Sequence, residues 1–173
     1  MQAGLFIIGL ISGSTRSVAD WVKAMALTLF EMAAEGKRKF ALIHFASKDK
    51  VKVDQFEPGK YTNRDVMAAM EHFFGGGTNF EAPLDEALKL IEQDYDKADV
   101  TIITDGEYKL NENYVQRLHQ AKERHQVSIT GIMLDKDADN KYDTLDAFCD
   151  QVYHSRDMTE DAIASRVIAE KTA

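Results

Sequence analysis

Hydroxyl and carboxyl side chains recur at three places where an apolar segment ends or a glycine-rich turn occurs. Ser12 and Ser14 follow the first apolar run of the sequence. Thr78 follows three consecutive glycines, and Asp105 follows the apolar run 98–104. Oxygen atoms of this kind are the ligands that a hard divalent cation such as Mg²⁺ prefers, with water completing its shell. The sequence therefore predicts a metal site formed by these four residues, provided that the fold brings them together.

The distribution of apolar residues predicts the elements that would position these side chains. Continuous apolar runs are typical of strands that are covered on both faces. They predict buried strands at 5–11, 40–46, 98–104 and 127–134, with a small strand at 151–154. Apolar residues at helical spacing predict a helix at about 17–35, with Gly36 as its C-cap. Further helices are expected at about 62–73, 81–95, 112–125, 142–150 and from about 159 onward.

The segment 51–56 differs from the other predicted strands because no helix precedes it. Only the polar residues SKDK separate it from the strand at 40–46, so the two should form an antiparallel hairpin at a sheet edge. Elsewhere strands alternate with helices, which indicates a mainly parallel sheet between two helical layers. We therefore expect one α/β three-layer domain over residues 1–173, in which ligands bind beyond the carboxyl ends of the strands. The first strand begins almost at residue 1, which is typical of a domain cut from a longer protein.

The motifs SGS, GGGTNF and TIITDGEY, in this order and together with the hairpin, resemble the von Willebrand factor A (vWA) domain. That family carries a metal-ion-dependent adhesion site with the pattern Asp-x-Ser-x-Ser in the first loop, Thr in the second and Asp in the third. Ser12 and Ser14 match the two serines, Thr78 matches the threonine, and Asp105 matches the second aspartate. GGGTNF and HFAS are most similar to the intracellular bacterial members of the CoxE-like and MoxR-associated type.

The resemblance implies a Rossmann-like sandwich and a non-enzymatic domain that binds a protein partner. In an intact member, Mg²⁺ keeps one coordination position open, and an acidic residue of the partner completes it. Analogy with the bacterial relatives implies a MoxR-type AAA+ ATPase as the partner. No G-x-S-x-G elbow and no Walker-type loop occurs in the sequence, so no catalytic motif points to an enzyme.

The first aspartate of the family pattern is replaced, because Leu10 stands at its position. This substitution removes one of the two carboxylates of the site, and Arg16 adds a positive charge to the same loop. Mg²⁺ gives up its water shell reluctantly, so a site with a single carboxylate should bind it weakly. We therefore expect a degenerate site at which metal binding is weak or absent.

The same loop also resembles the phosphate-binding loop of flavodoxin-like FMN reductases. Hydroxyl groups, a guanidinium and the free N–H groups of a helix start would bind an anion there. The residues concerned are Ser12, Ser14, Thr15, Arg16 and Ser17. A flavodoxin-like chain would need a helix where this chain has SKDK. A phosphate- or FMN-binding protein is therefore the alternative function.

Composition excludes several other classes of protein. The net charge of −8 and the lack of a basic cluster exclude a nucleic-acid surface. No apolar run approaches about 18 residues, so no membrane span is expected. Cys149 is the only cysteine, which favours a reducing compartment and hence the cytoplasm.

Three further features have plainer interpretations than their residue types suggest. The acidic segment 135–146 has the spacing of an EF-hand loop, but Asn140 replaces the required glycine and Asp146 replaces the final glutamate, so a surface loop is expected. His44 lies in a buried strand pattern, which predicts a hydrogen-bonded core histidine. Cys149 is expected to be a small core residue.

Overall fold

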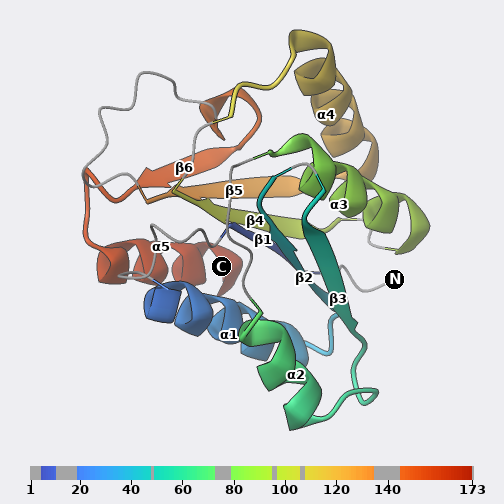
Figure 1. Cartoon of the computed structure of the whole chain (residues 1–173), viewed down its shortest axis with the longest axis vertical. Helices are drawn as coiled ribbons and strands as arrows, with labels where there is room; N and C mark the ends of the chain where they lie inside the picture. Colours follow the sequence, from blue (N-terminus) through green and yellow to red (C-terminus); the bar gives the residue numbers. More distant parts are fainter. Residues whose placement is uncertain are drawn as a thin grey trace.

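The computed structural model describes residues 5–10, 19–47, 49–72, 79–94, 97–105, 108–134 and 145–172 of the chain. In this part of the chain the strands are β1 (Leu5–Leu10), β2 (Phe40–Phe45), β3 (Val51–Phe56), β4 (Asp99–Thr104), β5 (Ser128–Met133) and β6 (Gln151–His154). The helices are α1 (Ala19–Glu35), α2 (Asn63–Met70), α3 (Glu81–Asp94), α4 (Glu112–His125) and α5 (Glu160–Thr172), with a one-turn 3₁₀ helix, η2 (Leu145–Ala147). Figure 1 shows the sheet between two layers of helices, as the alternation of elements predicts.

The strands form one sheet in the order β3-β2-β1-β4-β5-β6. β3 is antiparallel to β2, with Phe40 opposite Phe56 and Phe45 opposite Val51. Every other pair in the sheet is parallel. The prediction of an antiparallel edge hairpin is therefore confirmed. Without β3 the parallel strands have the order 2-1-3-4-5, which flavodoxin-like sheets share, so the antiparallel edge strand β3 is the feature that distinguishes this sheet from a flavodoxin-like one.

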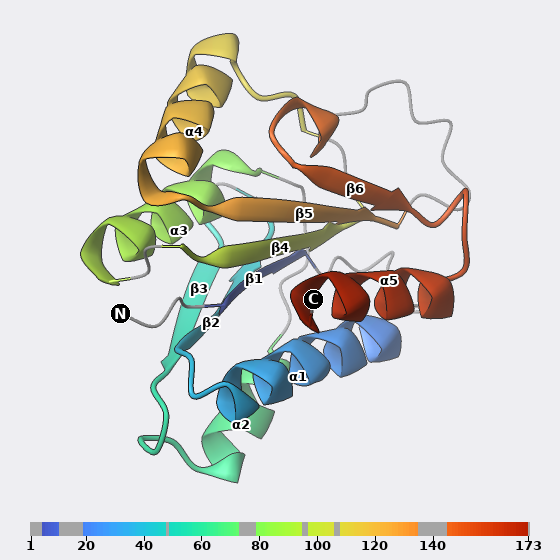
Figure 2. The ribbon, with the colours of Figure 1, turned by 180° about the vertical axis from the view of Figure 1, so that it is seen from behind.

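Each face of the sheet is covered by a different set of helices. In β2 every residue is buried. Ala41, Ile43 and Phe45 belong to the core under α3 and α4, whereas Phe40 and Leu42 pack with residues of α1, α2 and α5. Figure 2 shows these two layers on opposite sides of the sheet. The unbroken apolar sequence of this strand follows from its position, because both of its faces meet a core.

Local capping chemistry sets several helix boundaries. Thr62 begins α2 with a capping box, in which its hydroxyl accepts from the Asp65 N–H and its own N–H donates to the Asp65 carboxylate. Asn111 caps α4, because its side chain accepts from the Asn113 N–H at 2.8 Å. α1 ends differently from the prediction. The left-handed conformation falls on Lys37 (φ 53°) rather than on Gly36, and the Arg38 N–H closes the turn on the Ala33 oxygen at 2.8 Å.

The helix predicted at about 142–150 is another correction. Residues 135–144 lie outside the described residues, and the described part contains only the 3₁₀ turn η2. After this turn Phe148 is buried in the core, and Cys149 packs against it. A Cβ atom added at Gly131 would lie 3.0 Å from the Cys149 sulfur, so this strand position accepts only glycine without a shift. Burial raises the pKa of Cys149, whose half-buried side chain packs against the core cluster.

None of the helices in the described ranges is long and apolar enough to cross a membrane.

Candidate functional site

The candidate site lies at the carboxyl end of the sheet, which we define as the edge where β1, β2, β4 and β5 end. β1 and β4 are parallel neighbours, with Gly9 opposite Ile103. Leu10 is the last residue of β1, and Asp105 follows the last residue of β4. The strand order changes direction between these two strands, so this edge is the switch point at which open α/β sheets bind ligands. Asp105 is half-buried there.

Most of the predicted ligands fall on residues that the structure does not describe. Thr78 and the predicted first-loop residues lie outside the described residues, and these first-loop residues are Ser12, Ser14, Thr15, Arg16 and Ser17. Among the predicted site residues, the structure therefore places Asp105 alone. The convergence of the four predicted metal ligands stays a prediction.

Asn79 shows where the second predicted loop joins the sheet. Its N–H donates to the oxygen of Ala46, the residue after β2, at 2.8 Å. Its Oδ1 accepts from the Ala82 N–H at 3.2 Å and so caps the start of α3. Asn79, the residue after Thr78, thus lies at the carboxyl end of the sheet. The predicted metal site requires Thr78 to lie at this same end of the sheet.

The loop after β4 contacts the segment that follows Thr78. The Asn79 Nδ2 donates to the Tyr108 hydroxyl at 3.3 Å. The ring of Tyr108 meets the ring of the buried Phe80 edge to face, with centroids 6.0 Å apart. Sequence reasoning did not single out Asn79 or Tyr108, although both belong to the quoted motifs GGGTNF and TIITDGEY. An asparagine just before a predicted helix is a capping signal that could have identified the first of them.

The predicted ligands at this edge are oxygen donors, which a hard divalent cation prefers, but they include fewer carboxylates than the family pattern. Asp105 supplies a carboxylate, and the predicted partners are hydroxyl groups, which are also oxygen donors. Leu10 ends β1 where the family pattern has its other aspartate. Within the described ranges, no group of three or more His, Cys, Asp or Glu side chains could hold a metal ion. Of the predicted ligands, the described residues thus include one carboxylate, that of Asp105, and the fit of the whole set to a cation stays a prediction.

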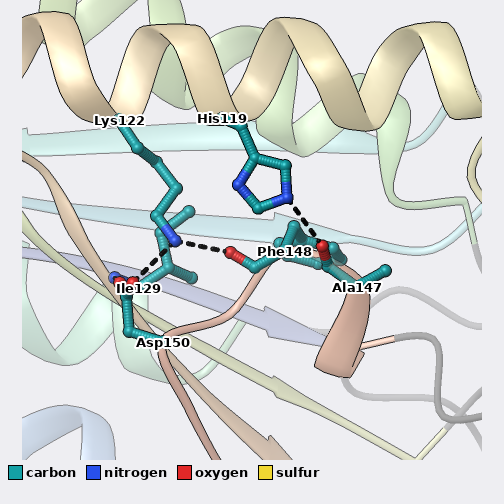
Figure 3. Close-up of polar contacts among 6 residues, drawn as sticks. All are labelled: His119, Lys122, Ile129, Ala147, Phe148 and Asp150. Atoms are coloured by element: carbon teal, nitrogen blue, oxygen red, sulfur yellow. Dashed lines mark hydrogen bonds and ion pairs between the residues drawn. The ribbon is translucent and has the colours of Figure 1, made fainter.

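A second cluster of polar contacts lies at the opposite, amino end of the sheet, where β4, β5 and β6 begin. Lys122 of α4 donates to the Asp150 Oδ1 and to the Phe148 oxygen, each at 2.8 Å (Figure 3). The other carboxylate oxygen of Asp150 accepts from the Ile129 N–H at 2.7 Å. Burial acts to raise the pKa of Asp150, but the hydrogen bonds from Lys122 and Ile129 lower it overall. These contacts fix the chain before β6 against α4.

His119 contributes to the same end of the molecule. Its Nε2–H donates to the Ala147 oxygen at 2.9 Å, as Figure 3 shows. All four side-chain contacts in this cluster end on the backbone or side chains of residues 129 and 147–150. The cluster is therefore structural: its donors and acceptors are used in holding η2 and β6 in place.

His44 is buried as predicted, but its environment differs from the prediction. It is 4% exposed, and its Nδ1 has no hydrogen-bond partner among the residues that the structure describes. Its ring meets that of His72 edge to face, with centroids 5.3 Å apart. Burial, then the charges of His72 and Lys52, lower the pKa of His44 to about 4, and Asp54 opposes the shift. His44 is thus a neutral core residue at neutral pH.

The sequence is similar to two archaeal proteins of unknown function. One uncharacterized protein of Methanocaldococcus jannaschii is 31% identical over 135 residues, which are 77% of this chain and 33% of that protein. A second uncharacterized protein of the same organism is 27% identical over 144 residues, covering 82% of this chain and 32% of that protein. The chain thus spans about a third of the length of these two relatives. No protein-family model matches the sequence.

Solved structures identify the fold. A von Willebrand factor type A protein from Catenulispora acidiphila superposes with a TM-score of 0.69 at 14% identity, covering 98% of this chain and 42% of that one. The SpRpn10 VWA domain gives a TM-score of 0.65 at 12% identity, with coverages of 89% and 88%. Mussel byssus proximal thread matrix protein 1, with a zinc-occupied MIDAS motif, gives 0.57 at 17%, with coverages of 95% and 46%. The chain has the vWA fold.

Proposed function

We propose that this chain is a non-enzymatic, vWA-type protein-interaction domain that binds its partner at the carboxyl end of the sheet. The observation that carries the proposal is the position of Asp105 at the strand switch point of a vWA fold. Asn79 adds support, because it brings the segment after Thr78 to the same edge. The domain acts by binding rather than by catalysis, since its sequence contains no catalytic motif.

The metal site of this domain is degenerate. Leu10 supplies neither a charge nor a hydrogen bond for a water ligand, so Asp105 is the only carboxylate of the family pattern that remains. Mg²⁺ demands near-octahedral oxygen coordination and keeps several of its waters, which carboxylates help to hold. The protein binds Mg²⁺ weakly or not at all, and its partner is recognised mainly by direct contacts.

Restoring the missing carboxylate tests this proposal. Leu10→Asp should raise the affinity for Mg²⁺ and Mn²⁺ at least about tenfold in titration calorimetry, because the second carboxylate can hold the metal's water ligands. Leu10→Asn is the matched control, since it has the same shape without the charge and should gain little. Micromolar affinity in the unmodified chain, or an equal response of both variants, contradicts the proposed site.

The partner is proposed to be a MoxR-type AAA+ ATPase in the cytoplasm, by analogy with intracellular bacterial vWA proteins. Binding of a purified ATPase of this class, measured by biolayer interferometry, should weaken in Asp105→Ala. Glu123→Ala is the control, because this exposed residue of α4 lies toward the amino end of the sheet. Equal binding by both variants would place the docking face elsewhere.

An anion site in the 12–17 loop is the alternative, and the loss of the carboxylate at position 10 favours it. Phosphate or the phosphate of FMN would be bound by the hydroxyl groups, by Arg16 and by the following helix start. The purified protein should then carry the yellow colour of flavin, or bind inorganic phosphate more tightly than Leu10→Asp does. A colourless protein whose phosphate affinity does not depend on residue 10 excludes this function.

A further inference from the structure

We infer that Tyr108 is a positioning residue of the carboxyl-end site, because it holds the segment that follows Thr78 against the loop that carries Asp105. This inference rests on the proposed function. It adds to that function a residue outside the family pattern. The hydroxyl of Tyr108 is the group through which it acts, and Asn79 is the residue on which it acts.

Asn79 links three elements through three separate atoms. Its N–H reaches the end of β2, its Oδ1 caps α3, and its Nδ2 reaches Tyr108. The first two contacts fix the segment relative to the sheet and to the helix on one face. The third is the side-chain hydrogen bond that connects this segment to the loop after β4. The distance between Asn79 and the chain at residue 108 is therefore set in part by the Tyr108 hydroxyl.

The ring of Tyr108 gives this contact a rigid support. It packs edge to face on Phe80, which is fully buried and in turn meets Phe45 with ring centroids 5.9 Å apart. Phe80 adjoins Asn79 in the sequence, so two consecutive residues contact the same tyrosine. Tyr108 is itself three residues after Asp105. A tyrosine anchored by its ring can set the position of its hydroxyl without contributing a ligand.

The hydroxyl is therefore expected to matter more for binding than for stability. Removing it leaves the ring contact with Phe80 and two of the three hydrogen bonds of Asn79. Asn79 and Tyr108 are both half-buried, so water can bond the Asn79 amide once the hydroxyl is removed, and the folding stability changes little. Metal coordination tolerates little displacement of its ligands, since Mg²⁺ and Mn²⁺ sites require defined oxygen geometry. Looser spacing of the loops should then appear as weaker metal binding.

The test measures Mn²⁺ affinity in the Leu10→Asp background, where binding is expected to be strong enough to quantify. Tyr108→Phe should weaken Mn²⁺ binding about three- to tenfold, the range carried by one neutral hydrogen bond, at a nearly unchanged melting temperature. Tyr61→Phe is the matched control. Tyr61 packs on Phe30 and Phe56 near the amino end of β2 and should leave the affinity unchanged.

Asn79→Ser completes the experiment, because it removes the Nδ2 donor but keeps a side-chain oxygen that can cap α3. It should weaken Mn²⁺ binding alone and add little when combined with Tyr108→Phe, since both changes break the same contact. Full additivity of the two effects, or an unchanged affinity in Tyr108→Phe, overturns the inference and leaves the proposed function standing.

Failure of Leu10→Asp to bind Mn²⁺ overturns the proposed metal site instead. Hydrogen exchange in the unmodified background then decides the inference by itself. Faster exchange of the amides of residues 79–84 in Tyr108→Phe, but not in Tyr61→Phe, supports the positioning role. Equal exchange in the two variants overturns it.

Discussion

The two ends of the sheet use polar side chains in different ways. At the amino end, opposite charges meet: Arg38 binds Asp99 at 3.0 Å, and Lys122 binds Asp150 at 2.8 Å. At the carboxyl end, the described link between loops joins two neutral groups, the amide of Asn79 and the hydroxyl of Tyr108. Charge-assisted hydrogen bonds are roughly twice as strong as neutral ones. Of these contacts between described residues, the stronger ones therefore lie away from the edge that we assign to binding.

Titratable groups at the two ends should also change the unfolding free energy over different pH ranges. His44 lies near the end of β2, with a pKa lowered to about 4 by burial and by the neighbouring His72 and Lys52 charges. In the unfolded chain its pKa is about 6.5, so the unfolded state binds more protons between these two values. The unfolding free energy should fall as the pH drops from 6.5 to 4, by at most about 3 kcal/mol at 1.36 kcal/mol per pKa unit. Urea unfolding at several pH values measures this loss.

His44→Leu should flatten that part of the stability profile, because leucine fills the buried position without a titrating group. His119→Gln is the matched control, since it replaces an exposed histidine at the other end of the sheet. The pKa of Asp150 is lowered in the folded protein, so its contribution is present at higher pH and is lost only below the ordinary aspartate range. Equal slopes in the wild type and in His44→Leu would remove His44 as the cause.

The second prediction concerns the amino end. Lys122→Met should lower the unfolding free energy by about 2 kcal/mol, because the Asp150 carboxylate and the Phe148 oxygen lose a charged donor in a partly desolvated place. The Lys122 side chain is only 11% exposed. Lys89→Met is the control, since its pair with Glu86 is exposed on α3 and should contribute less than about 0.5 kcal/mol. Chemical unfolding of both variants measures the difference, and similar losses would show that the cluster is no stronger than a surface pair.

Sequence reasoning succeeded where local pattern determines structure. β2 and β4 were predicted to within one residue, because strands covered on both faces must be apolar throughout. The hairpin followed from the short SKDK connection, which has no room for a crossover. α4 was placed at its observed bounds, where the structure has an asparagine cap before the helix and a left-handed residue, Gln126, after it.

It failed where the structure depends on contacts between distant residues. Asn79 and Tyr108 are 29 residues apart in the sequence, and Lys122 and Asp150 are 28 apart. No local sequence pattern therefore predicts either contact. Over residues 145–150 the structure has the 3₁₀ turn η2 in place of the predicted helix, and Cys149 packs against Gly131 of β5, which is again a distant partner. In the candidate site, the position of Asp105 after a buried strand could be predicted from the sequence. The hydrogen bond between Asn79 and Tyr108 could not.

The third prediction tests whether the two ends are independent. Asn79→Ala should lower the unfolding free energy by about 1 kcal/mol, because the cap of α3 and the link to Tyr108 are both lost. In the double variant with Lys122→Met the two losses should add to within about 0.5 kcal/mol. The reason is separation: strands of six residues are about 20 Å long, and the two sites lie toward opposite ends of them. Urea unfolding of the wild type, both single variants and the double variant gives the coupling energy directly. A coupling energy above about 1 kcal/mol would mean that the amino-end cluster also orders the binding edge. The two ends would then not be independent, which contradicts the comparison.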